Sequence, residues 1–88
     1  DKVISYHKHF SLISPSGVGL HDNYLFVCDK ELHAVFKIDI KSGHLIHRLV
    51  TTDQEPVSIC VTEKYVAYTD ALKLEIHLLD IDKLNVIR

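Results

Sequence analysis

The 88-residue sequence contains no methionine and no tryptophan, and it has only three glycines and two prolines. So few glycines leave no glycine-rich loop that could cradle a phosphate. No apolar run reaches the roughly 18 residues that a membrane span needs, so we expect no membrane association. Because a primary translation product begins with Met, the absence of Met and the start at Asp1 predict a processed chain or a segment of a longer protein.

The net charge and the number of cysteines are also low. Ten Lys and Arg are interspersed with twelve Asp and Glu, for a net charge of −2. No basic stripe is present, so we expect no nucleic-acid partner. Hydrophobic residues make up 47% of the chain, which is typical of a soluble globular domain. Cys28 and Cys60 are too few for a disulfide scaffold, so they predict two buried, unbonded thiols in a reducing compartment, the cytoplasm or nucleus.

What the sequence does contain is an internal repeat with a spacing of 41 residues. Identical residues at this spacing are Pro15 and Pro56, Tyr24 and Tyr65, Asp29 and Asp70, Asp39 and Asp80, Ile40 and Ile81, and Ile46 and Ile87. No insertion is needed to align the two units, and a fixed period of this kind indicates a repeat architecture.

Each unit predicts four short strands separated by turn residues. They cover residues 17–21, 24–29, 33–40 and 44–50 in the first unit, and 57–62, 65–70, 74–81 and 84–88 in the second. Both faces of the segment 24–29 are apolar, as expected for a sheet packed between two others. A small eight-stranded sandwich or barrel would account for the number of strands, but not for the repeat.

A period near 40 with four strands per unit is typical of a β-propeller. We therefore predict an all-β fold: a β-propeller fragment of two four-stranded antiparallel blades, residues 13–53 and 54–88. Residues 1–12 would supply the outer strand of a preceding blade. Since such units bury their faces only against neighbours, we expect the ring to be completed by the rest of a longer chain or by copies of this one, with three copies giving six blades as the simplest closure.

Four segments of the first unit resemble the propeller repeats of the YVTN and NHL types. They are Pro-Ser-Gly-Val-Gly-Leu from Pro15, Leu-Phe-Val-Cys-Asp from Leu25, Val-Phe-Lys-Ile-Asp from Val35 and Ser-Gly-His-Leu-Ile from Ser42. The resemblance covers the chain from about Pro15 onward and supports the propeller fold. It also implies that the connections from second to third and from fourth to first strands share one edge of the ring.

Few residues indicate chemistry. Asp29 and Asp70 each end a second strand, and their recurrence favours capping of the next turn over metal binding. His77 matches the apolar Phe36 and is interpreted as a satisfied core histidine, and His7 with His9 as an exposed edge pair. No catalytic motif is present, so we predict no catalytic residue, metal ligand or cofactor.

The predicted function is a non-catalytic, protein-binding scaffold. The two units differ most at the turns of the shared edge, and loops on a rigid framework commonly carry function. The predicted partner-binding residues are Lys30, Glu31, His33, Asp53, Gln54, Glu55 and Lys73. Two alternatives remain open, namely part of a propeller enzyme (a hydrolase or lyase) with an axial metal site, and a purely structural segment.

Overall fold

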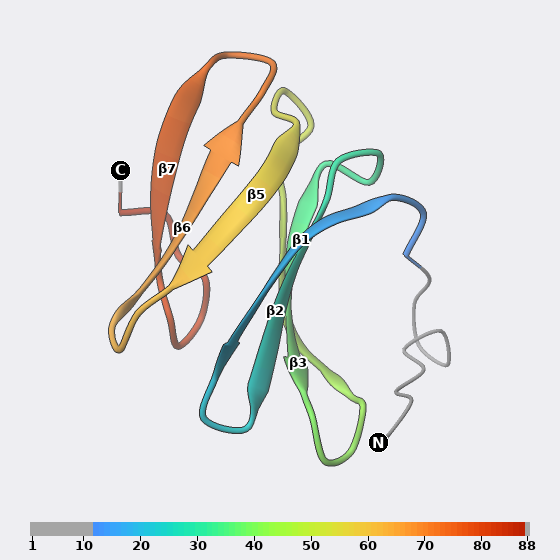
Figure 1. Ribbon diagram of the computed structural model, residues 1–88, viewed down its shortest axis with the longest axis vertical. Coiled ribbons are helices and arrows are strands. Elements are labelled where there is room, and N and C mark those ends of the chain that lie inside the picture. The colour runs from blue at the N-terminus through green and yellow to red at the C-terminus, as the bar shows by residue number, and fades with distance from the viewer. Residues whose placement is uncertain (1–11, 88) are drawn as a thin grey trace.

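The computed structural model describes residues 12–87, and its regular elements in this range are all β-strands. They are β1 (Pro15–His21), β2 (Tyr24–Asp29), β3 (Ala34–Asp39), β4 (Leu45–Val50), β5 (Pro56–Val61), β6 (Tyr65–Asp70) and β7 (Glu75–Asp80). A four-stranded antiparallel sheet in the order β1-β2-β3-β4, the first sheet, faces a three-stranded antiparallel sheet in the order β5-β6-β7, the second sheet (Figure 1). The predicted all-β class is confirmed.

The repeat extends to the backbone geometry of the turns. His33 and Leu74, at the 41-residue spacing, have φ of 54° and 57°, and Gly43 and Leu84 have φ of 74° and 61°. A left-handed conformation is unfavourable for a side chain such as Leu. The turn before Leu84 is held in this shape by Asp80, whose Oδ1 accepts a hydrogen bond from the amide of Lys83. The two sheets thus share the geometry of these two turns, although the first has four strands and the second has three.

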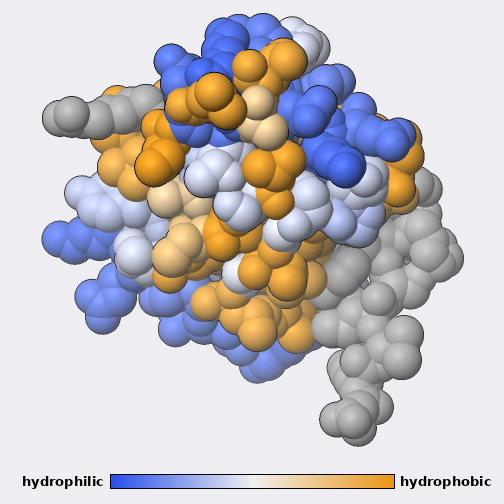
Figure 2. All heavy atoms as spheres, turned by 45° about the horizontal axis from the view of Figure 1, so that its top comes forward, coloured by the Kyte–Doolittle hydropathy of each residue, from blue (hydrophilic) through white to orange (hydrophobic). Residues whose placement is uncertain are grey.

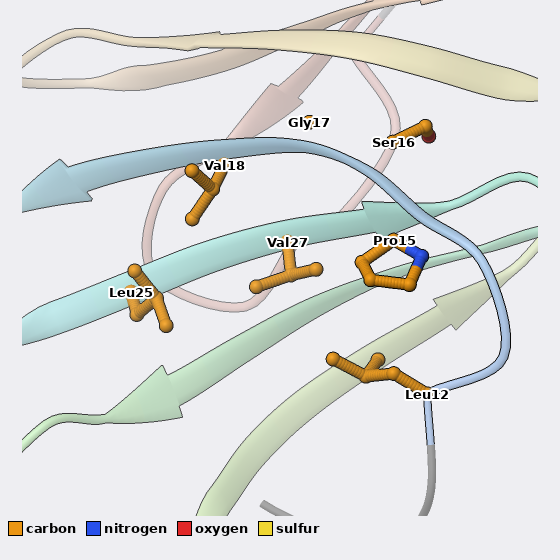
Figure 3. Close-up of a pocket in the computed structure, with 7 residues that line it drawn as sticks. All are labelled: Leu12, Pro15, Ser16, Gly17, Val18, Leu25 and Val27. Atoms are coloured by element: carbon orange, nitrogen blue, oxygen red, sulfur yellow. The ribbon is translucent and has the colours of Figure 1, made fainter. Parts of the chain in front are cut away.

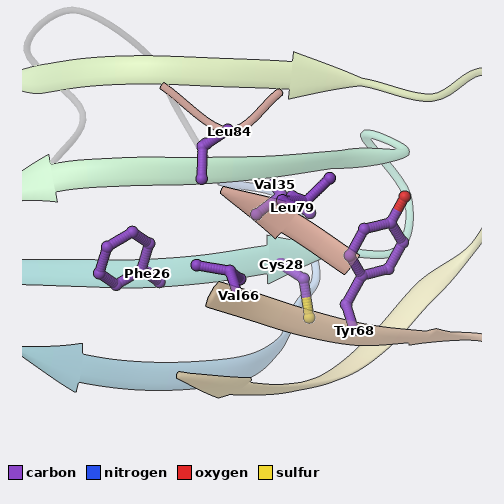
Figure 4. Packing of buried hydrophobic residues seen from close by; sticks show 7 residues of the cluster. All are labelled: Phe26, Cys28, Val35, Val66, Tyr68, Leu79 and Leu84. Carbon is purple, nitrogen blue, oxygen red and sulfur yellow. The ribbon is translucent and has the colours of Figure 1, made fainter. Parts of the chain in front are cut away.

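The main hydrophobic core lies between the two sheets (Figure 4). Its buried members are Phe26, Cys28 and Val35 from the first sheet and Val66, Tyr68, Leu79 and Leu84 from the second unit. Each large apolar side chain buried in this way contributes about 1.5–3 kcal/mol. The strands that meet across the interface are β1 and β2 on one side and β5 on the other.

Glycine in β1 makes this close approach possible. A Cβ on Gly17 would lie 3.0 Å from the Cα of Ser58, and a Cβ on Gly19 would lie 2.6 Å from Cγ2 of Val61. Both distances are too short for an unstrained contact, so a larger residue at either position would push the sheets apart. The side of β1 that carries these small residues is the side that packs on β5.

One charged side chain is buried between the sheets. The ammonium of Lys37 in β3 donates to the backbone oxygens of Ile81 and Asp82, both at 2.9 Å, and lies 4.3 Å from the centre of the Tyr24 ring. These acceptors and the aromatic face offset the cost of removing the charge from water. Lys37 thereby ties the first sheet to the turn that follows β7.

The outer face of the first sheet is only partly covered. Val27, Ala34, Phe36 and Ile38 form a second buried cluster there. Nearby in β1, Val18 and Leu20 are 61% and 64% exposed. On the outer face of the second sheet, Ile76 is 73% exposed. Both sheets thus present apolar side chains on the side turned away from their common core.

Two expectations from the sequence are corrected. The predicted fourth strand of the second unit, residues 84–88, forms only an isolated bridge between Val86 and Leu79 within the described residues. The amide of Asp80 donates to the backbone oxygen of Asn85 and that of Ile87 donates to Leu78, so this segment lies antiparallel beside β7, but the pairing is limited to that single bridge. Cys60 is exposed rather than buried, because its position in β5 places it on the outer face of the second sheet.

Other expectations lie partly beyond the described residues. The outer strand predicted for residues 1–12 falls on residues outside that range, apart from Leu12. Cys28 and Cys60 are both free, as predicted. Within residues 12–87, no helix is long and apolar enough to cross a membrane.

Candidate functional site

Three connections lie together at one end of the molecule, and we call this end the turn edge. It consists of residues 30–33 between β2 and β3, 51–55 between β4 and β5, and 71–74 between β6 and β7, and it is at the top in Figure 1. Backbone hydrogen bonds join them: the amide of Thr51 donates to His33, and that of Ala71 donates to Glu55. Seen from this end, hydrophilic residues gather above a band of hydrophobic ones (Figure 2).

The turn edge contains all seven predicted partner-binding residues, in two groups. Lys30, Glu31, His33 and Glu55 line one open hollow of about 360 Å³. His33 is held in place by a contact of 2.6 Å between its Nδ1 and the backbone oxygen of Gln54. The hollow therefore has a charged lining with both signs, which suits a polar or charged group of a partner.

The second group lies beside the second sheet. The ammonium of Lys73 pairs with the Asp53 carboxylate at 2.6 Å, and this hydrogen bond lowers the pKa of Asp53 and raises the pKa of Lys73. Both side chains are well exposed, so the pair contributes little to stability. The side-chain oxygen of Gln54 accepts a hydrogen bond from the hydroxyl of Tyr68, so Gln54 faces the core rather than solvent.

The recurring aspartates cap the turns, as the sequence predicts. Both carboxylate oxygens of Asp29 are used, because they accept hydrogen bonds from the backbone amides of Ile13, Ser14, Glu31 and Leu32. Asp70 occupies the same place in the second unit, but only its Oδ1 is used, by the amides of Glu55, Leu72 and Lys73. Burial of Asp70 raises its pKa, the three amides lower it, and the net pKa is below the ordinary value.

The free oxygen of Asp70 points to a cluster that the sequence interpretation missed. Oδ2 of Asp70 lies 3.5 Å from Nε2 of His77, and the same nitrogen lies 3.4 Å from Oε1 of Glu75. Neither Oδ2 nor Nε2 has a hydrogen-bond partner, although both atoms are buried. His77 is thus not the satisfied core histidine that its match to Phe36 predicted. Its Nε2 faces carboxylate oxygens of Asp70 and Glu75 but has no hydrogen-bond partner.

A signal for this cluster was present in the repeat. Glu75 and His77 replace Ala34 and Phe36 of the first unit, two polar exchanges on the same face of one strand. They flank Asp70, which recurs unchanged from the first unit. Because both exchanges lie beside an aspartate that the two units have in common, together they indicate a local function more strongly than either exchange alone.

A different hollow lies on the outer face of the first sheet (Figure 3). It has a volume of about 340 Å³ and is lined by Leu12, Pro15, Ser16, Gly17, Val18, Leu25 and Val27. The lining is mostly apolar and carries no ionisable side chain. Its chemistry fits packing against another apolar surface better than binding of a charged ligand.

In comparisons with known proteins, no protein family matches the sequence, and no curated protein matches it significantly. The features of this chain that bear on its function are therefore the repeat, the two outer faces and the turn edge.

Proposed function

We propose that the chain is a segment of a β-propeller and acts as a non-catalytic, protein-binding scaffold. The observation that carries this proposal is that each outer face repeats one half of the interface between the two sheets. Sheets that stack by one repeated step are the structural basis of propellers and solenoids.

The outer face of the second sheet corresponds, in the repeat, to the side of the first sheet that packs in the interface. The first sheet packs on its neighbour through Gly17, Gly19, Phe26, Cys28 and Val35. The residues 41 positions later are Ser58, Cys60, Ala67, Thr69 and Ile76, and none of them is buried. Because side chains alternate along a strand, these residues share the face of the second sheet that points away from the first.

The outer face of the first sheet corresponds, in turn, to the side of the second sheet that packs in the interface. The second sheet packs inward through Ile59, Val61, Val66, Tyr68 and Leu79. Their counterparts in the first unit are Val18, Leu20, Leu25, Val27 and Ile38, which lie on the outer face of the first sheet. In the proposed stacking, a further sheet from a longer chain or another copy would pack on the second sheet's outer face and on the exposed part of the first sheet's outer face, at Val18 and Leu20.

Self-association of the 88-residue chain tests this stacking. We expect sedimentation velocity to show assembly that increases with protein concentration, and the double variant Val18→Glu/Leu20→Glu to abolish it. Lys41→Glu in the β3–β4 turn is a matched control, since it also adds negative charge but lies off both faces. A wild-type chain that stays folded and monomeric at every concentration would contradict the proposal.

Partner binding is assigned to the turn edge. Its support is the hollow lined by Lys30, Glu31, His33 and Glu55, on connections whose sequences differ between the two units. The charge exchange Lys30→Glu/Glu31→Lys should weaken capture of the partner while leaving the melting temperature nearly unchanged. If capture survives this exchange but fails on changing Asp22 and Lys41, the opposite edge is the binding surface.

A further inference from the structure

We propose that Asp70, Glu75 and His77 form a zinc-binding site at the turn edge of the second sheet. One ligand atom from each residue lies within 4.8 Å of the other two. The residues come from the end of β6 and the start of β7, so the β6–β7 hairpin alone builds the site. The inference does not depend on the proposed scaffold function.

Two buried polar atoms in this cluster have no hydrogen-bond partner. The side chain of Asp70 is fully buried, yet its Oδ2 has no hydrogen bond, and neither does Nε2 of His77. A buried polar atom without a partner is costly, so folded proteins rarely leave two of them facing each other. A cation bound between them would satisfy both.

The distances between the candidate ligand atoms also fit a zinc ion. Zinc binds histidine nitrogen and carboxylate oxygen at about 2.0–2.2 Å, so neighbouring ligands of a tetrahedral ion lie roughly 3.3–3.5 Å apart. The observed separations at His77 are 3.5 Å to Asp70 and 3.4 Å to Glu75. The side chain of Glu75 is 55% exposed, so it is free to adjust its position toward Asp70.

The ligands are also held in place by their neighbours. Three backbone amides on Oδ1 fix the Asp70 carboxylate with Oδ2 directed at His77. The ring of Tyr68 stacks on that of His77, with centroids 5.1 Å apart and an interplanar angle of 28°. Such supporting contacts orient metal ligands and raise affinity. Lys73, whose amide is one of the three donors, has its ammonium paired with Asp53.

The donor set favours zinc over the hard cations. One imidazole and two carboxylates give three protein ligands, which is the number found in open zinc sites where water takes the fourth position. Calcium prefers six to eight oxygen ligands, and magnesium keeps most of its water. The alternative without metal is direct contact of His77 with the two carboxylates, and the experiment separates the two.

Equilibrium dialysis of the full chain against zinc chloride, followed by metal analysis, tests the site. We expect one zinc per chain for the wild type and for the control His7→Gln/His9→Gln. The affinity should fall by about 10–100-fold or more for Glu75→Gln and for His77→Phe. Glu75→Gln changes only a half-exposed side chain at the strand edge, so it keeps the test valid if His77→Phe disturbs folding.

A second measurement uses the metal itself as a probe. Cobalt in place of zinc should give the intense visible absorption of a four-coordinate ion in the wild type and lose it in both variants. Zinc should also raise the wild-type melting temperature, and this rise should disappear with the ligands. No zinc uptake by the wild type, unchanged affinity in Glu75→Gln and His77→Phe, or loss of zinc only in the His7/His9 control would each overturn the proposal.

Discussion

The two sheets are built on one repeat, and they differ most at the corner where the second strand enters its turn. In the first sheet this corner is closed: Asp29 uses both oxygens, and Ala34 and Phe36 beside it are buried. In the second sheet the corner carries Glu75 and His77 in their place. Shared positions such as the capping aspartates maintain the fold, and the positions that diverge are those where a local function can arise.

The structural origin of this difference is two backbone amides. Oδ2 of Asp29 accepts hydrogen bonds from the amide of Ile13 at 2.7 Å and from that of Ser14 at 3.0 Å. Of their counterparts in the second unit, the amide of Gln54 donates instead to the backbone oxygen of Thr51 at 3.0 Å, and that of Glu55 donates only to Oδ1 of Asp70. Oδ2 of Asp70 is therefore left without the donors that its first-unit equivalent has. A change in one loop thus converts a structural cap into half of a candidate metal site.

Placing the residues of one corner in the other should have the largest effect on the stability of the chain. Ala34→Glu with Phe36→His removes a buried aromatic ring and places a carboxylate beside an aspartate that has no free oxygen. We expect the free energy of unfolding to fall by about 3–5 kcal/mol, or the chain to lose its fold. Urea denaturation followed by circular dichroism measures this. The reverse exchange, Glu75→Ala with His77→Phe, should leave a folded chain, and equal tolerance of both exchanges would show that the corners are interchangeable.

Swapping the β1 and β5 residues at the interface tests the second difference. Gly17→Ser places atoms where a Cβ already meets Ser58 at 3.0 Å, so we expect a loss of about 1–3 kcal/mol from overpacking. Ser58→Gly, on the outer face, should cost only about 0.5–1 kcal/mol, through backbone entropy and the loss of the exposed hydrogen bond between the Ser58 and Thr69 hydroxyls. The two urea midpoints are compared under the same conditions. A smaller loss for Gly17→Ser than for Ser58→Gly would contradict the close approach of β1 and β5.

Alkaline pH should destabilise the second sheet through Tyr68, which has no tyrosine counterpart in the first. Burial, with the charges of Asp70 and Asp53, raises the pKa of Tyr68 to about 12, while its counterpart in the first sheet is Val27. A raised pKa favours the neutral phenol in the folded state, so this contribution is complete below about pH 10 and is lost as pH rises toward 12. Melting temperatures across this range should fall more steeply for the wild type than for Tyr68→Phe. Parallel curves would show that Tyr68 is not the responsible group.

The smallest effect is expected at the cysteines. Burial raises the pKa of Cys28, whereas Cys60 is exposed. Ellman's reagent should therefore modify Cys60 rapidly and Cys28 only when the chain unfolds. Cys60→Ser should change the free energy of unfolding by less than about 0.5 kcal/mol. Fast labelling of both thiols in the folded chain would contradict the burial of Cys28.

Strand positions were largely predictable from the sequence, because alternation and the repeat both specify them. Tyr24–Asp29 and Tyr65–Asp70 were predicted to the residue. The fourth strand of the second unit was overpredicted, since its segment makes only one bridge to β7, and the number of backbone hydrogen bonds that form is not revealed by a hydrophobic pattern.

The corner was harder to predict, because its chemistry depends on distances between side chains of two strands. The repeat correctly identified Asp70 as a cap, but whether one or both of its oxygens are used depends on where the amide of Gln54 points. The seven turn-edge residues could be selected from sequence divergence, although the separation of Asp53, Gln54 and Lys73 from the hollow could not. Partner binding by that edge remains a prediction.

The buried Lys37 has a consequence for geometry rather than stability. β1 and β5 meet closely at the glycines, while the Lys37 side chain fills the space between β3 and the turn after β7. The sheets thus lie close together along one side and are spaced by the long Lys37 side chain along the other, so they stand at an angle to each other. In the proposed ring of such sheets, the angle between neighbouring sheets sets how many fit around the circle. The length of the side chain at position 37 would then contribute to the angle at this one interface, because its counterpart 41 residues later is the shorter, uncharged Leu78.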